Sequence, residues 1–93
     1  MALYFEWDTE KAAQNYAKHG VTFAEAEGVF ADPLALERPD PDHSAAEKRW
    51  IIVGQSYRAR LLVVVFTERR EAIRVISARL ATRAETNRYE EQE

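Results

Sequence analysis

The segment that most restricts the fold is Leu61–Phe66, a run of six apolar residues that no polar residue interrupts. Alternate residues of a strand point to opposite faces, so a strand here would be apolar on both. Such a strand needs cover on both sides of its sheet. We expect two short helices to cover one side, and a terminal helix or another protein to cover the other. Six residues are too few to cross a bilayer, which takes about 20 in a helix.

Length and composition restrict the class of protein further. The chain has 93 residues, which predicts a single domain spanning 1–93. Its 46% hydrophobic and 31% charged residues are typical of a globular fold rather than a disordered chain. The lack of cysteine excludes a disulfide scaffold, a thiol nucleophile and a thiolate metal site. Met1–Phe5 has no signal-peptide pattern, so we expect a cytoplasmic protein without membrane contact.

The first half of the chain predicts a short strand and a helix. Tyr4–Trp7 has the composition of a strand. Asp8 or Thr9 would cap a helix that runs to about His19. Gly20 follows it and is the usual residue for a left-handed helix end.

A second helix is predicted by the segment Thr22–Glu25, whose Thr-x-x-Glu pattern is that of a capping box. Asp32-Pro33 would end this helix. Its apolar residues fall on one stripe that should face a sheet: Phe23, Ala26, Val29 and Phe30.

The second half changes to the patterns of strands and turns. We expect an edge strand, a turn-rich stretch and three further strands at Leu34–Leu36, Arg38–His43, Trp50–Val53, Leu61–Thr67 and Ala72–Ser77. The short polar connections between the last three strands fit hairpins, which makes the sheet antiparallel. A second Thr-x-x-Glu pattern, Thr82–Glu85, opens a final helix that runs through Tyr89. The fold predicted is α+β, with two N-terminal helices packed on an antiparallel meander and a C-terminal helix.

The net charge of −3 is distributed unevenly along the chain. Residues 1–48 carry a net charge of −6, whereas residues 49–93 carry +3. The window Arg49–Arg83 holds eight arginines, two glutamates and no lysine. Arginine binds phosphate through a planar fork, so the window is consistent with a local anion site. The alternative is that these arginines are solvated charges at strand ends and turns.

Two of these arginines are candidates for binding a phosphate. Arg60 opens one strand and Arg79 closes another, and alternate strand ends of a meander meet at one rim of the sheet. We therefore expect the two guanidinium groups to converge on one phosphate whose charge grows in a transition state. Arginine stays protonated, so another group must move the proton, and His43, Glu47 and Glu68 are the candidates.

Other polar residues have plainer interpretations. Asp40, Asp42 and His43 could bind a metal, but their spacing matches no strong motif and a turn is the simpler reading. Lys18 and His19 suit the last turn of a helix, where cations meet its dipole, although Lys18 could also project toward an anion. Only three glycines occur and no phosphate-binding loop, so neither a nucleotide cofactor nor a metal is expected.

These motifs together resemble the BrnT toxin family. The opening is carried by Phe5-Glu6-Trp7-Asp8, Lys11, Asn15 and Lys18-His19-Gly20-Val21-x-Phe23. The resemblance continues in order through Asp42-His43-Ser44-x-x-Glu47-x-Arg49, Gly54-x-Ser56, Arg60-x-Leu62-x-Val64, Arg74-Val75-Ile76-Ser77-Ala78-Arg79, Ala81-Thr82, Glu85 and Tyr89. It covers nearly the whole chain, from about Phe5 to Glu90.

The resemblance implies a RelE-like fold and the toxin half of a type II toxin–antitoxin pair. It implies a ribonuclease that cuts RNA and blocks translation, for which we expect no metal requirement. The partner implied is a BrnA-like antitoxin with a ribbon-helix-helix DNA-binding domain, so that operator DNA is contacted only through the antitoxin. A basic antitoxin segment would suit the acidic first half of the chain, whereas an acidic one could plug the arginine rim.

For the site residues, the resemblance supports Arg60 and Arg79 as phosphate-facing groups. His43, Glu47 and Glu68 match its motif positions without an assigned proton carrier, and we expect His43 or Glu68 to move the proton. We expect Lys18, Arg49, Arg74 and Arg83 to bind RNA. The alternative function is a binding module without catalysis, which would dock the antitoxin through the second face of the sheet.

Overall fold

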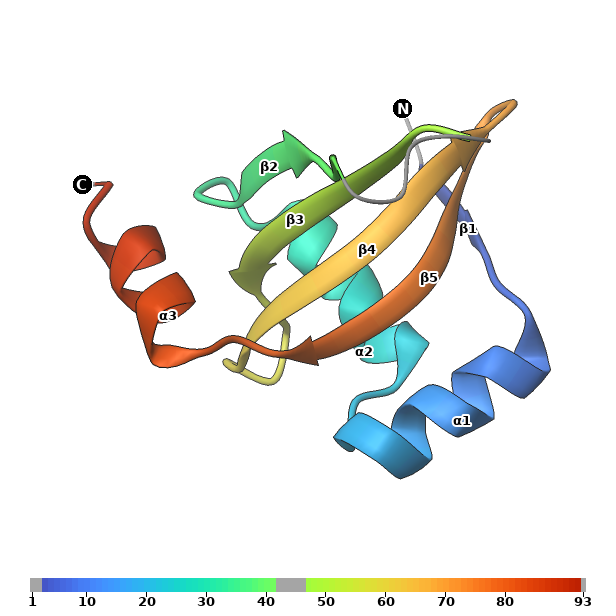
Figure 1. Ribbon diagram of the computed structural model, residues 1–93, viewed down its shortest axis with the longest axis horizontal. Helices are drawn as coiled ribbons and strands as arrows, with labels where there is room; N and C mark the ends of the chain where they lie inside the picture. Colours follow the sequence, from blue (N-terminus) through green and yellow to red (C-terminus); the bar gives the residue numbers. More distant parts are fainter. Residues whose placement is uncertain (1–2, 42–46, 93) are drawn as a thin grey trace.

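The computed structural model describes residues 3–41 and 47–92 (Figure 1). Over these residues the elements follow the order β1 (Tyr4–Glu6), α1 (Thr9–His19), α2 (Phe23–Glu27), a 3-10 turn η1 (Gly28–Ala31), β2 (Leu36–Pro39), β3 (Arg49–Gln55), β4 (Leu61–Arg69), β5 (Ala72–Leu80) and α3 (Arg83–Glu90). The predicted α+β class is confirmed. The second predicted helix is split, because the chain tightens into η1 after only five α-helical residues.

The sheet is mixed rather than wholly antiparallel. Its strand order is β1-β5-β4-β3-β2, and the four strands β2 to β5 form the predicted antiparallel meander. The first strand departs from the prediction, because β1 pairs with β5 in parallel. The two helices between β1 and the meander return the chain to the same end of the sheet, and that return makes β1 parallel to its neighbour (Figure 1).

The predicted strands are found, but their bounds move. β2 spans Leu36–Pro39 rather than Leu34–Leu36, so part of the predicted turn is a strand. Pro39 is tolerated there because β2 is an edge strand, where a missing N–H removes no bond from a central ladder. β5 continues past Ser77 to Leu80. Both strands extend beyond the predicted segments, because backbone pairing with a neighbouring strand determines where a strand ends.

The hydrophobic core lies between one face of the sheet and the helices α1 and α2. The predicted apolar stripe is confirmed, since its first three members are buried and face the sheet. Phe30 packs edge-on against both Phe5 and Phe66, at centroid distances of 5.2 and 4.9 Å. The residues that the sheet contributes to this core are Ile52, Leu62, Val64, Phe66, Val75 and Ala78.

The helix ends confirm most of the predicted caps. The Asp8 carboxylate accepts from backbone N–H groups of the first turn of α1, and Gly20 ends the helix with φ of 69°. Thr82 and Glu85 form the complete capping box of α3. At α2 only half of the predicted box forms, because Glu25 donates its N–H to the Thr22 hydroxyl but turns its carboxylate away.

An asparagine covers the free edge of β5. β1 pairs only with Ala72–Arg74, so the later part of β5 has no strand beside it among the described residues. Asn15 of α1 fills that position: its amide accepts from the Ala78 N–H at 3.1 Å and donates to the Ala78 carbonyl at 2.9 Å. The same amide donates to the Val21 carbonyl at 3.0 Å. This buried side chain therefore ties α1 to the sheet.

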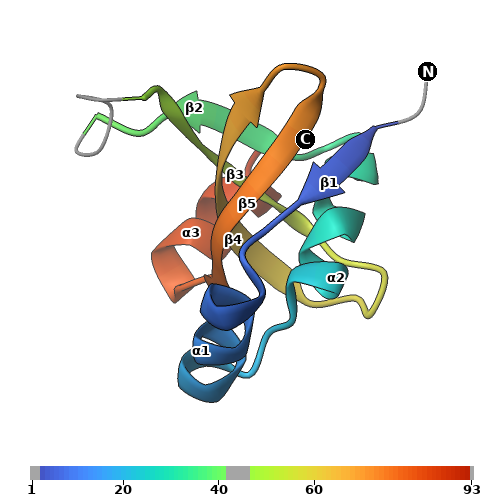
Figure 2. The same ribbon diagram turned by 90° about the vertical axis from the view of Figure 1, so that its right-hand side faces the viewer.

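The second face of the sheet, opposite α2, is covered only in part by α3 (Figure 2). No residue of α3 is buried. The helix is held by polar contacts instead, including a hydrogen bond of 2.5 Å from the Tyr89 hydroxyl to Asp32 and one of 2.7 Å from Gln92 to the Leu34 carbonyl. A terminal helix was expected to lie over this face, and α3 covers only a small area of it.

Candidate nucleic-acid interface

A small polar pocket of about 130 Å³ lies where the start of α1 meets the sheet. Four cationic side chains from four different elements line it: Lys11 of α1, Arg49 of β3, Arg69 of β4 and Arg74 of β5. We call these four residues the basic pocket. Asp8 and Glu47 are the acidic residues of its lining.

Strand register explains why the arginines gather here. Arg49 pairs with Thr67 of β4, and Thr67 pairs with Arg74 of β5. Residues directly opposite one another share a face of the sheet, so the two arginines flank one short side chain. The Thr67 hydroxyl is occupied, because it donates to the Lys48 carbonyl at 2.6 Å. Arg49 and Arg74 therefore lie on the same face of the sheet with only the small Thr67 side chain between them.

The positive charge of the basic pocket is only partly neutralised. Arg69 contacts Glu47 at 3.5 Å, and Arg74 contacts Glu6 at 3.0 Å. Lys11 and Arg49 form no ion pair with any residue that the structure describes. The Arg49 Nε atom is buried and has no hydrogen-bond partner there. A buried donor left without an acceptor is unfavourable, so this atom would gain from an anionic oxygen.

The two carboxylates of the pocket differ in the hydrogen bonds and ion pairs that they form. Asp8 accepts hydrogen bonds from the backbone N–H groups of Lys11 and Glu10, and these bonds hold the pKa of Asp8 below its usual value. It is therefore committed to the helix cap as an anion. Glu47 has one long contact with Arg69 and is about one-third exposed, with 37% of its side chain accessible. Glu47 is the carboxylate of this lining that no helix cap engages.

A groove of about 260 Å³ between α1 and β5 continues from the basic pocket, with Lys11 and Ile76 lining both. Lys18, His19 and Ser77 lie further along this α1–β5 groove. Lys18 and His19 occupy the last turn of α1, where a cation also complements the helix dipole. The groove thus extends the positive surface in a line that a polyanionic strand can follow.

The predicted convergence of Arg60 and Arg79 is wrong. Both residues lie at the same end of the sheet, but their side chains bind to helices on opposite faces. Arg60 contacts Glu25 of α2, whereas Arg79 pairs with Val63 and reaches Glu85 of α3. The meander brings strand ends together, but the face on which each side chain lies depends on register.

Each of these arginines already has a carboxylate partner. Arg60 contacts Glu25 with both Nε and Nη2, and the Ser56 hydroxyl donates to the same carboxylate at 2.7 Å. The side-chain hydrogen bond from Arg60 lowers the pKa of Glu25, which is 1% exposed. Arg79 donates twice to Glu85 at 2.8 Å and lowers the pKa of Glu85 to about 2. Both pairs connect a helix to the sheet.

Comparison with known proteins identifies the family. Residues 7–85 match the family described as "Ribonuclease toxin, BrnT, of type II toxin-antitoxin system". The chain belongs to the BrnT family. Its fold is similar to the 1.1 Å crystal structure of the Brucella abortus ribonuclease toxin BrnT, with a TM-score of 0.65 and 26% identity over 88% of this chain and 100% of that one. No curated protein matches the chain in sequence. Membership of a type II toxin family implies an antitoxin partner.

The other site residues expected from the BrnT resemblance do not all lie in the basic pocket. Arg49 and Arg74 lie together in the basic pocket, and Lys18 lies in the adjoining groove. Arg83 begins α3 and lines neither. Glu68 is exposed and pairs with Ile73, which packs toward the core, so it points away from the basic pocket. His43 and Asp42 lie outside the described residues.

Two residues of this BrnT pocket were not among the predicted site residues, namely Lys11 and Arg69. Arg69 lies in the arginine-rich window, and Lys11 is part of the opening motif, so both carried a signal. The sequence alone does not show the strand register that brings these residues together. The described residues also hold no cluster of three potential metal ligands and no helix long and apolar enough to span a membrane.

Proposed function

We propose that this protein cleaves RNA at the basic pocket without a metal ion, and that it inhibits translation in the cytoplasm until a BrnA-type antitoxin neutralises it. The observation that carries the proposal is the gathering of four cations in one pocket, whose lining also holds the partly exposed carboxylate of Glu47. We infer further that the antitoxin supplies a ribbon-helix-helix domain, through which the complex contacts operator DNA. Family membership supports both statements.

Binding of RNA begins with phosphate contacts. Lys11 and Arg49 form no ion pair with a described residue, and we expect both to bind a phosphate. Arg69 and Arg74 add positive charge at the same place. The α1–β5 groove, with Lys18, would hold a neighbouring phosphate of the same strand. The bound segment is therefore single-stranded RNA whose backbone crosses from the pocket into the groove.

The chemical step is an internal transfer at phosphorus. Glu47 takes the proton from a 2′-hydroxyl, the 2′ oxygen forms a bond to the adjacent phosphorus, and the bond to the 5′ oxygen breaks. The leaving oxygen takes up a proton from water or from His43, and the products are a 2′,3′-cyclic phosphate and a 5′-hydroxyl. The phosphorus centre gains negative charge on the way, and the four cations stabilise that charge.

The test is cleavage of a labelled single-stranded RNA by purified protein in the presence of EDTA. Replacing Arg49 by Ala or Glu47 by Gln should each lower the cleavage rate on the order of 10²-fold. Arg70→Ala and Glu71→Gln are matched controls, since both residues are exposed in the β4–β5 turn next to the pocket. Glu68→Gln tests the alternative carboxylate. Cleavage that requires a divalent metal, or that survives both pocket substitutions, would overturn the mechanism.

A non-catalytic binding module is the second candidate function. The observation in its favour is that α3 buries none of its residues, and that Ile51, Val53 and Val65 on the second sheet face are only half-buried. Inducing the protein in growing cells separates the two functions. A ribonuclease toxin arrests growth, and co-expression of the adjacent open reading frame relieves the arrest. A binding module leaves growth unchanged while it still binds that neighbour tightly.

A further inference from the structure

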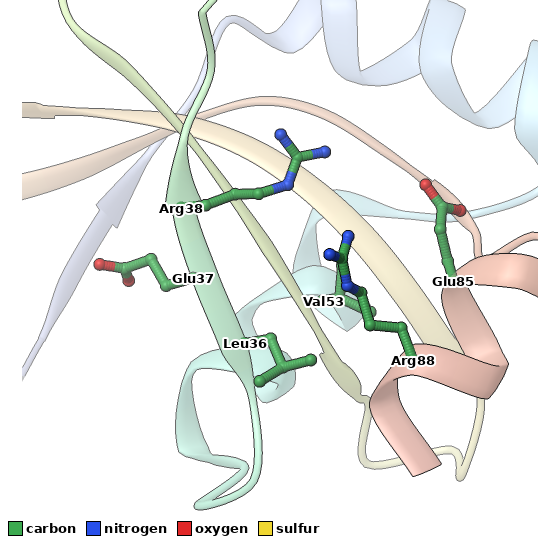
Figure 3. Close-up of a pocket in the computed structure, with 6 residues that line it drawn as sticks. All are labelled: Leu36, Glu37, Arg38, Val53, Glu85 and Arg88. Carbon is green, nitrogen blue, oxygen red and sulfur yellow. The ribbon is translucent and has the colours of Figure 1, made fainter. Parts of the chain in front are cut away.

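A groove of about 210 Å³ lies between the edge strand β2 and the helix α3 (Figure 3). We call it the β2–α3 groove, and its lining residues are Leu36, Glu37, Arg38, Val53, Glu85 and Arg88. Leu36 and Val53 are register partners on neighbouring strands, and both are half-buried. They give the groove an apolar floor, large enough for one aliphatic side chain of a partner.

Two arginine side chains line the groove beside this apolar floor. Arg38 extends from β2 and Arg88 from α3, and both guanidinium groups reach over the groove (Figure 3). Both side chains are exposed, and neither forms an ion pair with a described residue. Two cations from different elements, neither paired with an acid in the described part of the chain, therefore face one small apolar depression.

The acids of the lining do not neutralise these arginines. Glu85 is engaged by Arg79 through two hydrogen bonds and by the backbone N–H of Thr82. Glu37 points away from the groove (Figure 3). The positive charge of Arg38 and Arg88 is thus available to a carboxylate that arrives from outside.

We propose that the β2–α3 groove is the docking site for an acidic segment of the partner protein, with an aliphatic side chain on the floor and carboxylates bound by Arg38 and Arg88. The proposal uses the antitoxin partner of the proposed function but none of its catalytic residues. The apolar floor favours a protein segment over RNA, because an aliphatic side chain can be buried there and a phosphate cannot.

The position of the groove explains how docking there would block RNA. Arg38 pairs with Ile51, which lies two residues from Arg49 along β3. Alternate residues of a strand share a face and lie about 7 Å apart. A segment anchored at Arg38 and running along the second face of the sheet therefore passes over the basic pocket.

The outer edge of β2 supports an extended conformation for this segment. β2 is the last strand of the sheet, so no described strand pairs with its outer side. Its unpaired backbone groups can accept one further strand, a common mode of peptide recognition. Such pairing would hold one stretch of the segment beside β2, while the adjoining stretch turns over the groove and onto the second face of the sheet.

The test measures binding of the product of the adjacent open reading frame, purified and labelled, to variants of this protein. The double variant Arg38→Glu/Arg88→Glu should weaken binding roughly 10²-fold, because each reversed charge repels a carboxylate of the segment. Arg83→Glu is the matched control, since it makes the same change on the same helix outside the groove, and it should bind within threefold of the original protein. Circular dichroism checks that each variant is folded.

Overlapping peptides from the partner then identify the segment. The peptide that binds the original protein but not the double variant should be acidic and contain an aliphatic residue. Unchanged binding of the partner to the double variant would overturn the proposal, as would loss of labelled single-stranded RNA binding without loss of the partner. RNA cleavage is not part of this test, so failure of the ribonuclease mechanism leaves its outcome interpretable.

Discussion

Arg60, which lies just before β4, forms an ion pair with the buried carboxylate of Glu25 in α2. This ion pair, rather than a helix cap, holds the second helix against the sheet. Gly20 joins this arrangement, because its carbonyl accepts from Arg60 Nη2 at 3.2 Å. The Arg60 side chain is 29% exposed, whereas that of Glu25 is 1% exposed. The arginine is therefore the accessible half of a pair whose other half is inside the protein.

Replacing Arg60 by Ala should destabilise the fold strongly, because it leaves the buried carboxylate of Glu25 with only the Ser56 hydroxyl and the more distant Arg58. Urea unfolding followed by circular dichroism measures this. Arg79→Ala is the comparison, since it breaks a pair in which both side chains are more exposed, and about 1 kcal/mol is expected there. Equal effects of the two substitutions would contradict the role assigned to burial.

Acid should weaken the protein through Glu85 and Glu25. Arg79 lowers the pKa of Glu85 from 4.5 to about 2, and Arg60 lowers that of Glu25. A carboxyl whose pKa is depressed by folding stabilises the folded state above its unfolded value and loses that contribution as the pH falls through its folded value. The free energy of unfolding should therefore fall from about pH 4.5 toward pH 2.

Glu85→Gln checks this dependence, because it removes one of the two titrating groups. The variant should be less stable than the original protein at pH 7, and its stability should decline less between pH 4.5 and pH 2. Urea midpoints at several pH values supply the comparison. Parallel curves for the two proteins would show that Glu85 does not titrate as stated.

Asn15→Ala should destabilise the fold by roughly 3 kcal/mol, since it leaves the buried backbone groups of Ala78 and Val21 without partners. Gln14→Ala, an exposed neighbour in α1, should change stability by about 0.5 kcal/mol or less. Hydrogen exchange gives a second readout, because the Ala78 amide should lose its protection in the Asn15 variant. A protected Ala78 amide would mean that another group covers this edge of β5.

RNA binding should depend on salt through the lysines of α1. Lys11→Ala should weaken RNA binding at low salt and lower the slope of log K against log salt by about 1, because one phosphate contact is lost. Fluorescence anisotropy with a labelled single-stranded RNA measures both quantities. An unchanged slope would place the RNA elsewhere on the protein.

Local signals in the sequence predicted most of the fold. Gly20 and the Thr82–Glu85 box mark helix ends through contacts among near neighbours, and both were found as expected. Glu25 shows where such reasoning fails, because a distant arginine competes successfully for its carboxylate. The parallel pairing of β1 likewise depends on a segment about 68 residues away.

The candidate site was harder to predict than the fold. Arg49 and Arg74 were expected to bind RNA, and the structure brings them together through Thr67. Arg60 and Arg79 were expected to meet, yet their side chains lie on opposite faces. Arginine composition is consistent with an anion site, but only strand register decides which arginines lie close enough to share one anion.

Polar contacts attach α3 to the rest of the protein, and this affects which positions of the helix can vary. Glu85 and Tyr89 anchor the helix to Arg79 and Asp32, while none of its residues is buried in the core. Arg88 lines the β2–α3 groove and takes no part in this anchoring, so its replacement alters the groove without disturbing the core. If an antitoxin docks in the groove as proposed, a change at this one position would alter which antitoxin the protein accepts while the scaffold stays the same.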